Sequence, residues 1–220
     1  MVEGGAPSGL FVVFEGGDGV GKSTQVSLLA AALQQAGISH TVTFEPGATW
    51  LGAHVRDLVL NPESGPICPP AEALLYAADK AQHVAEVICP GIAAGQVVIS
   101  DRYIDSVIAY QGAGRQLGDD TIERLVGWAT GGLRPDLTVL LDADPADAVA
   151  LICQKDRLED AGLALHQRAR QCFLDLAARH PNRYLVLEAT APQADIAAAV
   201  RRRLSQLGLN LSAPAEMMDA

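Results

Sequence analysis

The sequence has few aromatic residues and a shortage of positive charge. Aromatic residues make up 5% of its 220 residues, so aliphatic side chains must fill most of the core. The formal net charge is -10. A protein that binds duplex nucleic acid needs a basic face to neutralise phosphates, so this charge argues against that function. We therefore expect no nucleic-acid partner, and any bound nucleotide should be small.

The sequence also has few cysteines and no long apolar run. The four cysteines lie far apart without a C-x-x-C pair, which indicates reduced thiols rather than a disulfide framework or a zinc site. The first residues, MVEGGAPSG, lack the basic and apolar regions of a signal peptide. No apolar run reaches the roughly 20 residues that span a bilayer. We expect a cytoplasmic protein without a membrane partner.

Five short runs rich in Val, Ile and Leu are present instead. They are LFVVFE (10–15), HTVTFE (40–45), QVVISD (96–101), DLTVLLDA (136–143) and RYLVLEA (183–189). Most are nearly continuous, which is typical of strands covered on both faces and therefore of a parallel sheet. The segments between them have helical patterns, as parallel crossovers require. The sequence predicts an α/β fold: a five-stranded parallel sheet with helices on both faces.

One predicted helix spans 69–90. It starts with two prolines, which suit a first turn, and we expect it to end before Pro90. One apolar stripe comprises Leu74, Ala78, Ala81, Ala85 and Ile88. A second face carries Tyr76, Lys80, His83 and Val87, with Tyr76 and Lys80 one turn apart.

A phosphate-binding loop follows the first predicted strand. The residues Gly16-x-x-x-x-Gly21-Lys22-Ser23 match the pattern G-x-x-x-x-G-K-[ST] in full. The glycines let backbone N–H groups converge on phosphate oxygens, and the following helix adds its positive dipole end. We expect Lys22 to reach the β- and γ-phosphates and Ser23 to bind Mg²⁺. The predicted ATP-binding residues are Gly16, Gly17, Asp18, Gly19, Val20, Gly21, Lys22, Ser23 and Thr24.

Polar residues follow the other predicted strands. Ligands of open parallel sheets lie beyond the carboxyl ends of the strands, so these residues are candidates for a second site. Asp101 and Arg102 leave a buried strand together. A surface ion pair is one reading of this pair, but we favour an acceptor-phosphate clamp because arginine fits phosphate geometry. Arg56, on a short helix after the second strand, is a second candidate clamp.

Several motifs then occur in the order found in the thymidylate kinase family. They are FEGGDGVGKST, FEPGATWLGAHVR, LLYAADKAQHV, DRYIDSVIAYQG, RPDLTVLLDADP and KDRLEDAGLALHQRAR, within residues 10–195. The chain resembles this family. The resemblance implies transfer of the γ-phosphate of ATP to dTMP, with Mg²⁺ as cofactor, on a P-loop NTPase fold with a mobile lid. It also implies a homodimer.

The resemblance assigns roles to individual residues. Asp18 would meet the sugar 3′-hydroxyl of the acceptor, Tyr76 would stack on thymine, and Tyr110 would crowd the 2′ position. The implied catalytic residues are Lys22, Asp101, Arg102 and Arg157, and the implied metal ligands are Ser23 and Asp101. The implied acceptor-binding residues are Asp18, Glu45, Arg56, Tyr76, Lys80, Arg102, Tyr110 and Gln111. The implied division is a flexible N-terminus (1–9), one domain (10–208) with a lid near 151–162, and a flexible tail (209–220).

The sequence departs from the family pattern at the base site and in the lid. Lys80 stands where an arginine usually reads the thymine edge, and Val107 stands where a polar residue is common. The lid offers few arginines, and Ala164 replaces an acidic residue. Two alternatives therefore remain at this stage: a kinase for another nucleotide or a deoxynucleoside, and a degenerate nucleotide-binding module with a regulatory function.

Overall fold

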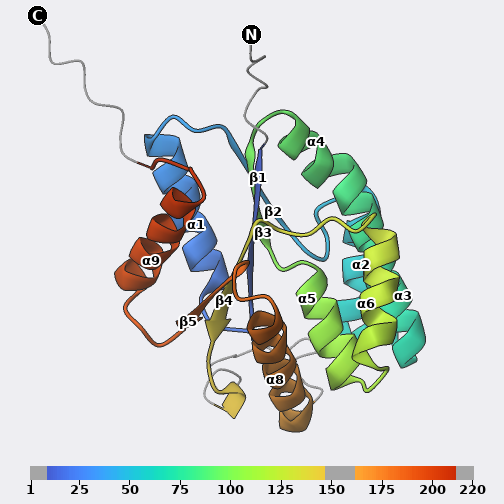
Figure 1. Ribbon diagram of the computed structural model, residues 1–220. Helices are drawn as coiled ribbons and strands as arrows, with labels where there is room; N and C mark the ends of the chain where they lie inside the picture. Colours follow the sequence, from blue (N-terminus) through green and yellow to red (C-terminus); the bar gives the residue numbers. More distant parts are fainter. Residues whose placement is uncertain (1–8, 147–161, 212–220) are drawn as a thin grey trace, which may run out of the picture.

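A parallel β-sheet between two layers of helices forms the frame of the structure (Figure 1). The computed structural model describes residues 9–146 and 162–211, and in these residues the sheet has five strands in the order β2-β3-β1-β4-β5. The strands are β1 (Leu10–Gly16), β2 (His40–Phe44), β3 (Val97–Asp101), β4 (Leu137–Asp142) and β5 (Tyr184–Glu188). Every strand pair is parallel. The predicted fold class is confirmed, and each strand lies within a residue or two of its expected range.

The sheet register brings the carboxyl ends of the central strands to one edge. Phe14 of β1 is paired with Asp101 of β3, and Gly16 with Leu141 of β4. Because all strands run in the same direction, the loops that leave them meet at this edge. The phosphate-binding loop and the Asp101–Arg102 pair are therefore neighbours in space.

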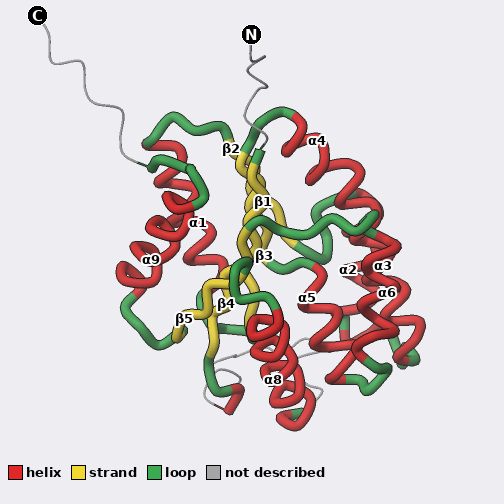
Figure 2. The backbone as a smooth tube through the Cα atoms, viewed as in Figure 1, coloured by secondary structure: helices red, strands yellow, loops and turns green. Residues whose placement is uncertain are grey.

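Helices cover both faces of the sheet (Figure 2). On one face, α1 (Lys22–Gln35) and α9 (Gln193–Gln206) pack through aliphatic side chains onto Val12 and Phe14. The other face, with Phe11 and Val13, carries the larger helical layer. This layer comprises α2 (Trp50–Leu60), α3 (Pro69–His83), α4 (Cys89–Ala93), α5 (Ile104–Val107), α6 (Asp119–Ala129), α8 (Leu163–Arg179), the 3₁₀ turn η1 (Pro62–Ser64) and the π-helical segments η2 (Val84–Ile88) and η3 (Ile108–Gly114).

The helix predicted for 69–90 continues further than expected. It does not end before Pro90, because the π-helical turn η2 shifts the backbone pairing and places Pro90 in the first turn of α4. The apolar stripe is exposed at one end, where Leu74 is 58% exposed, and buried at the other, where Ile88 joins the core. The buried face is the one that carries Tyr76 and Lys80. This face can be buried because its charged side chains have partners in neighbouring elements.

The expected terminal segments and lid lie largely outside the described residues. Of the predicted tail, residues 209–211 are described, and Leu209 and Leu211 rest against the core. The predicted lid near 151–162 and Arg157 fall almost wholly in 147–161, which the structure does not describe. Within the described part of the chain, no helix is long and apolar enough to cross a membrane.

Candidate functional site: a phosphate loop beside a second cavity

The phosphate-binding loop connects β1 to α1 and contains three glycines with positive φ angles. Gly16, Gly19 and Gly21 have φ values of 134°, 74° and 91°. A Cβ atom on Gly16 would lie 2.3 Å from the carbonyl oxygen of Leu141, so only glycine fits where β1 meets β4. The loop and the N-terminus of α1 thus have the backbone geometry expected of an anion-binding turn.

Lys22 lies over this loop and is nearly buried. Its Nζ atom donates to the carbonyl oxygens of Gly17 at 2.5 Å and Gly16 at 3.3 Å. An ammonium group has three N–H donors, so a phosphate oxygen can take the remaining one. Burial, together with the charge of Arg102, lowers the pKa of Lys22 to about 8.

Ser23 and Asp101 lie together at the edge of the loop. The Ser23 hydroxyl donates to Asp101 Oδ2 at 2.7 Å. Two adjacent oxygen donors suit Mg²⁺, which kinases bind through one or two protein groups and the substrate phosphates. In the described residues no group of three His, Cys, Asp or Glu side chains could hold a metal ion alone. The structure thus brings the two predicted metal ligands together.

Arg102 has an unusual backbone and a well-ordered set of contacts. Its φ is 72°, which is rare for a residue with a side chain and is common at functional sites. The guanidinium forms an ion pair with Asp18 and donates to Gly16 O at 3.0 Å and to Ser106 Oγ at 2.9 Å. Burial alone would raise the pKa of Asp18, but the charges of Arg102 and Lys22 hold it below its ordinary value.

A cavity of about 160 Å³ opens beside this ion pair. It lies between the phosphate-binding loop, the second half of α2, the buried face of α3 and the segment η3. All eight predicted acceptor-binding residues line it: Asp18, Glu45, Arg56, Tyr76, Lys80, Arg102, Tyr110 and Gln111. The Tyr110 hydroxyl donates to Asp18 Oδ2 at 3.2 Å, which connects this cavity to the loop.

A second cavity of about 470 Å³ follows the phosphate-binding loop past Lys22, Ser23 and Asp101. The two cavities have four lining residues in common, namely Asp18, Glu45, Arg56 and Arg102. A ligand on the loop and a ligand in the smaller cavity would therefore meet at these side chains.

Glu45 is the centre of a buried charge cluster in the wall of the smaller cavity. It forms an ion pair with Lys80 and accepts from His83 Nδ1 at 2.7 Å. Burial alone would raise the pKa of Glu45, but Lys80 and His83 lower it. His83 also contacts Thr43 Oγ1 at 2.6 Å, which fixes its ring. Lys80 therefore lines the cavity with its Nζ atom already in contact with the Glu45 carboxylate.

Arg56 reaches the cavity from α2. Its Nη1 atom donates to Pro46 O at 2.8 Å, and its guanidinium lies 5.7 Å from the centre of the Phe44 ring. The Phe44 ring supports the arginine through a cation–π contact. Arg56 lines both cavities.

Several buried residues that support the site were missed by sequence reasoning. Glu15 is fully buried and accepts from Tyr103 N at 2.8 Å, Ser106 N at 3.2 Å and Ser106 Oγ at 2.6 Å. Glu15 thereby holds Ser106, whose hydroxyl oxygen accepts from Arg102. Burial and the Asp105 carboxyl raise the pKa of Glu15 to about 7. An acidic residue inside an apolar strand was the signal available in the sequence.

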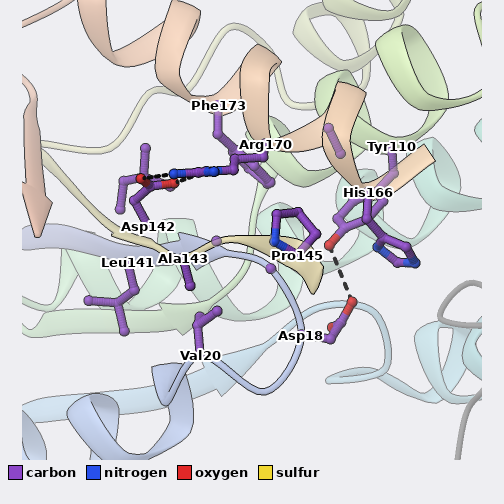
Figure 3. Close-up of a pocket in the computed structure, with 14 residues that line it drawn as sticks. Asp18, Val20, Tyr110, Leu141, Asp142, Ala143, Pro145, His166, Arg170 and Phe173 are labelled. Carbon is purple, nitrogen blue, oxygen red and sulfur yellow. Dashed lines mark hydrogen bonds and ion pairs between the residues drawn. The ribbon is translucent and has the colours of Figure 1, made fainter. Parts of the chain in front are cut away.

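A narrow cleft of about 20 Å³ lies on the other side of the loop (Figure 3). Arg170 of α8 forms a two-pronged ion pair with Asp142 at the end of β4, with distances of 2.7 and 2.9 Å. His166 lies beside the Tyr110 ring. Ala164, in the first turn of α8, is exposed. The ion pair between Arg170 and Asp142 attaches α8 to the sheet next to the phosphate-binding loop.

Comparisons with known proteins agree with this geometry. The family model for thymidylate kinase matches residues 14–200. Thymidylate kinase of Cutibacterium acnes is 58% identical over 199 residues, which are 90% of this chain and 98% of that protein. Thymidylate kinase of Clavibacter michiganensis subsp. michiganensis is 51% identical over 204 residues, 91% of this chain and 96% of that protein.

A solved structure gives the same answer. The present structure superimposes on the crystal structure of thymidylate kinase from Ehrlichia chaffeensis with a TM-score of 0.74 and 29% sequence identity. The match covers 92% of this chain and 100% of the Ehrlichia chain. Because the matches span nearly the whole sequence and include the phosphate-binding loop and the neighbouring cavity, the chain belongs to the thymidylate kinase family.

Proposed function

We propose that this protein transfers the γ-phosphoryl group of ATP to dTMP, giving dTDP and ADP in the synthesis of dTTP. The observation that carries the proposal is that the two cavities meet at Asp18, Glu45, Arg56 and Arg102. An enzyme that transfers a phosphoryl group between two nucleotides must bring the donor and the acceptor phosphate together in this way. The relatives are named thymidylate kinases, which gives no support to a different acceptor or to a degenerate regulatory module.

The side chains act mainly by alignment and charge stabilisation, which are the principal requirements of phosphoryl transfer. Lys22 binds the phosphates of ATP, while Arg102 and Arg56 bind the phosphate of dTMP. Asp18 accepts from the sugar 3′-hydroxyl, Tyr76 stacks on the base, and Tyr110 closes the space at the sugar 2′ position. The role that the resemblance implies for Arg157, contact with the transferred group, belongs to a residue outside the described part of the chain.

Mg²⁺ is the proposed cofactor, with Ser23 and Asp101 as its protein ligands. When bound, the ion supplies positive charge to the phosphate oxygens of ATP. The hydrogen bond between Ser23 and Asp101 at 2.7 Å supports this assignment, because it shows that both oxygens can face one point.

The test is ADP release with Mg²⁺-ATP and a panel of acceptors: dTMP, dUMP, dGMP, dCMP, AMP and UMP. We expect a clear preference for dTMP. ATP binding without turnover of any acceptor would refute the proposal.

We further propose that the protein is a homodimer that associates through α2, α3 and α6. Leu58, Leu74 and Trp128 stand on these helices with exposed fractions of 46%, 58% and 83%, and exposed apolar side chains on neighbouring helices favour an interface. Light scattering should show a dimer that Leu74→Lys weakens and that Leu28→Lys, on the opposite layer, does not. A monomeric wild-type protein would contradict the proposal.

A cytoplasmic location is also proposed. Cys68 and Cys89 are free thiols at the surface, and Cys172 is a free thiol in the core. Free surface thiols suit a reducing compartment. Fractionation of cells that produce the protein would test this.

A further inference from the structure

Gln111 has a fixed orientation in the wall of the smaller cavity, the proposed acceptor site. It lies in η3, is 1% exposed, and lines the cavity together with Tyr76 and Lys80. Its Nε2 atom donates to Glu72 Oε1 at 3.0 Å. Glu72 belongs to the buried face of α3 and is 2% exposed. The hydrogen bond joins two buried side chains that are 39 positions apart in the sequence.

Glu72 is itself held by Arg115, which directly follows η3. Arg115 Nε donates to Glu72 Oε1 at 3.1 Å, and Arg115 Nη2 donates to Glu72 Oε2 at 3.2 Å. A two-pronged contact of this kind fixes both the position and the plane of a carboxylate. The backbone N–H of Arg115 in turn donates to Tyr110 O at 2.8 Å, which ties the arginine to the cavity wall.

The chemistry of the carboxylate determines which atom Gln111 offers to a ligand. An ionised carboxylate only accepts hydrogen bonds, so the amide of Gln111 must turn its NH₂ group toward Glu72. The carbonyl oxygen is the other terminal atom of the same planar group. Gln111 thus offers the cavity an acceptor whose orientation is set before any ligand binds, which strengthens discrimination.

We propose that Glu72 is a positioning residue that, through Gln111, makes the acceptor site select bases with a ring N–H donor. Thymine and uracil carry N3–H and can donate to the Gln111 oxygen. Cytosine has an unprotonated N3, whose lone pair would face that oxygen. A site built around one hydrogen-bonding pattern rejects a ligand that leaves its polar groups unpaired. This inference rests on the proposed function.

Glu72→Gln tests the inference, because glutamine can donate as well as accept and so no longer dictates which way the Gln111 amide turns. We measure kcat/KM for dTMP, dUMP and dCMP with Mg²⁺-ATP. The preference for dTMP over dCMP should fall about tenfold, the effect of roughly one hydrogen bond. The preference for dTMP over dUMP should not change, since both bases carry N3–H. A site that is merely loosened would alter both ratios.

A double-mutant comparison shows whether Glu72 acts through Gln111. In a Gln111→Ala background, Glu72→Gln should not change the dTMP:dCMP ratio any further. The matched control is Glu86→Gln, an exposed glutamate in η2, which should retain the wild-type ratios. If Glu72→Gln does not fold, Arg115→Gln releases the same carboxylate from a partly exposed position and should lower the dTMP:dCMP ratio.

An unchanged dTMP:dCMP ratio in the folded Glu72→Gln and Arg115→Gln variants would overturn the inference. An equal fall in the Gln111→Ala background would also overturn it. The proposed function would survive both outcomes, because it depends on the wild-type preference for dTMP. If wild-type protein itself shows no such preference, the proposed function fails first.

Discussion

The guanidinium of Arg102 forms an ion pair with the carboxylate of Asp18, a residue 84 positions earlier in the chain, inside the phosphate-binding loop. The same guanidinium donates to the carbonyl oxygen of Gly16 at 3.0 Å. The residue proposed to bind the acceptor phosphate is thus fastened to the loop proposed to bind ATP. A ligand on the loop and a ligand in the smaller cavity would therefore meet at one group of connected side chains.

Lys22→Ala removes the ammonium group above the loop. We expect kcat to fall on the order of 10²-fold or more, the size of effect seen when one preorganised charge or donor is lost at a transition state. Steady-state ADP release with dTMP measures it. Arg202→Ala, at an exposed position in α9, is the matched control and should keep the wild-type rate. A Lys22→Ala protein with half of the wild-type activity would refute the role of Lys22.

Arg102→Ala removes the proposed clamp on the acceptor phosphate. The KM for dTMP should rise about tenfold or more, because a lost hydrogen bond to a charged group has this effect, and the KM for ATP should rise much less. Initial rates with each substrate varied in turn give both values. Arg124→Ala, at an exposed position in α6, serves as control. Equal rises in both KM values would place Arg102 outside the acceptor site.

Asp101→Asn weakens the proposed Mg²⁺ site while it retains the shape of the side chain. We expect the Mg²⁺ concentration for half-maximal activity to rise about tenfold, a typical effect of altering a group that supports a metal ion. Chelation by EDTA should abolish the wild-type activity and excess Mg²⁺ should restore it. Asp175→Asn, exposed on α8, is the control. An unchanged Mg²⁺ requirement in Asp101→Asn would contradict the assignment.

Glu15 makes the stability of the protein depend on pH. Its pKa is about 7 in the folded protein against an ordinary value of 4.5, so between these values the folded state binds more protons than the unfolded state. The contribution of Glu15 to the free energy of unfolding is therefore fully present below pH 4.5 and is lost as the pH rises through about 7. Glu15→Gln cannot ionise and should lack this loss.

The measurement is the melting temperature of both proteins from about pH 5 to about pH 8, the range in which the linkage acts. As the pH rises, the melting temperature of Glu15→Gln should increase relative to that of the wild-type protein. Glu188→Gln, an exposed position in β5, should show the wild-type pH dependence. Melting curves of Glu15→Gln and wild type that shift in parallel with pH would show that Glu15 does not titrate in this range.

The strands and the phosphate-binding loop could be predicted because their signals are local. A buried parallel strand needs a continuous apolar run, and LFVVFE in β1 has one. A loop that surrounds phosphates needs glycines at fixed spacing, which Gly16 and Gly21 supply. The acceptor-binding residues came from an ordered set of motifs, and the structure places all eight around one cavity. Their individual roles stay predictions.

The face of α3 that is buried could not be predicted in the same way. The sequence showed apolar residues on two faces of this helix and did not distinguish between them, and the buried side carries Glu72, Asp79, Lys80 and His83. Each of these charged or polar groups has a partner on another element, such as Arg115 for Glu72 and Glu45 for Lys80. Burial of a charge is favourable only when its partner is in place, and partners distant in the sequence leave no periodic signal.

The sequence by itself determined the strands and the phosphate-binding loop, because each depends on neighbours within a few positions. It also supplied the acceptor-binding residues, through the ordered motifs that resemble one family. Only the tertiary structure decided how these residues act together. It placed β1 between β3 and β4, brought Arg102 to Asp18, and set the amide of Gln111 against Glu72. These relationships depend on the register of the sheet and on the packing of helices against it, which join residues that the chain keeps far apart.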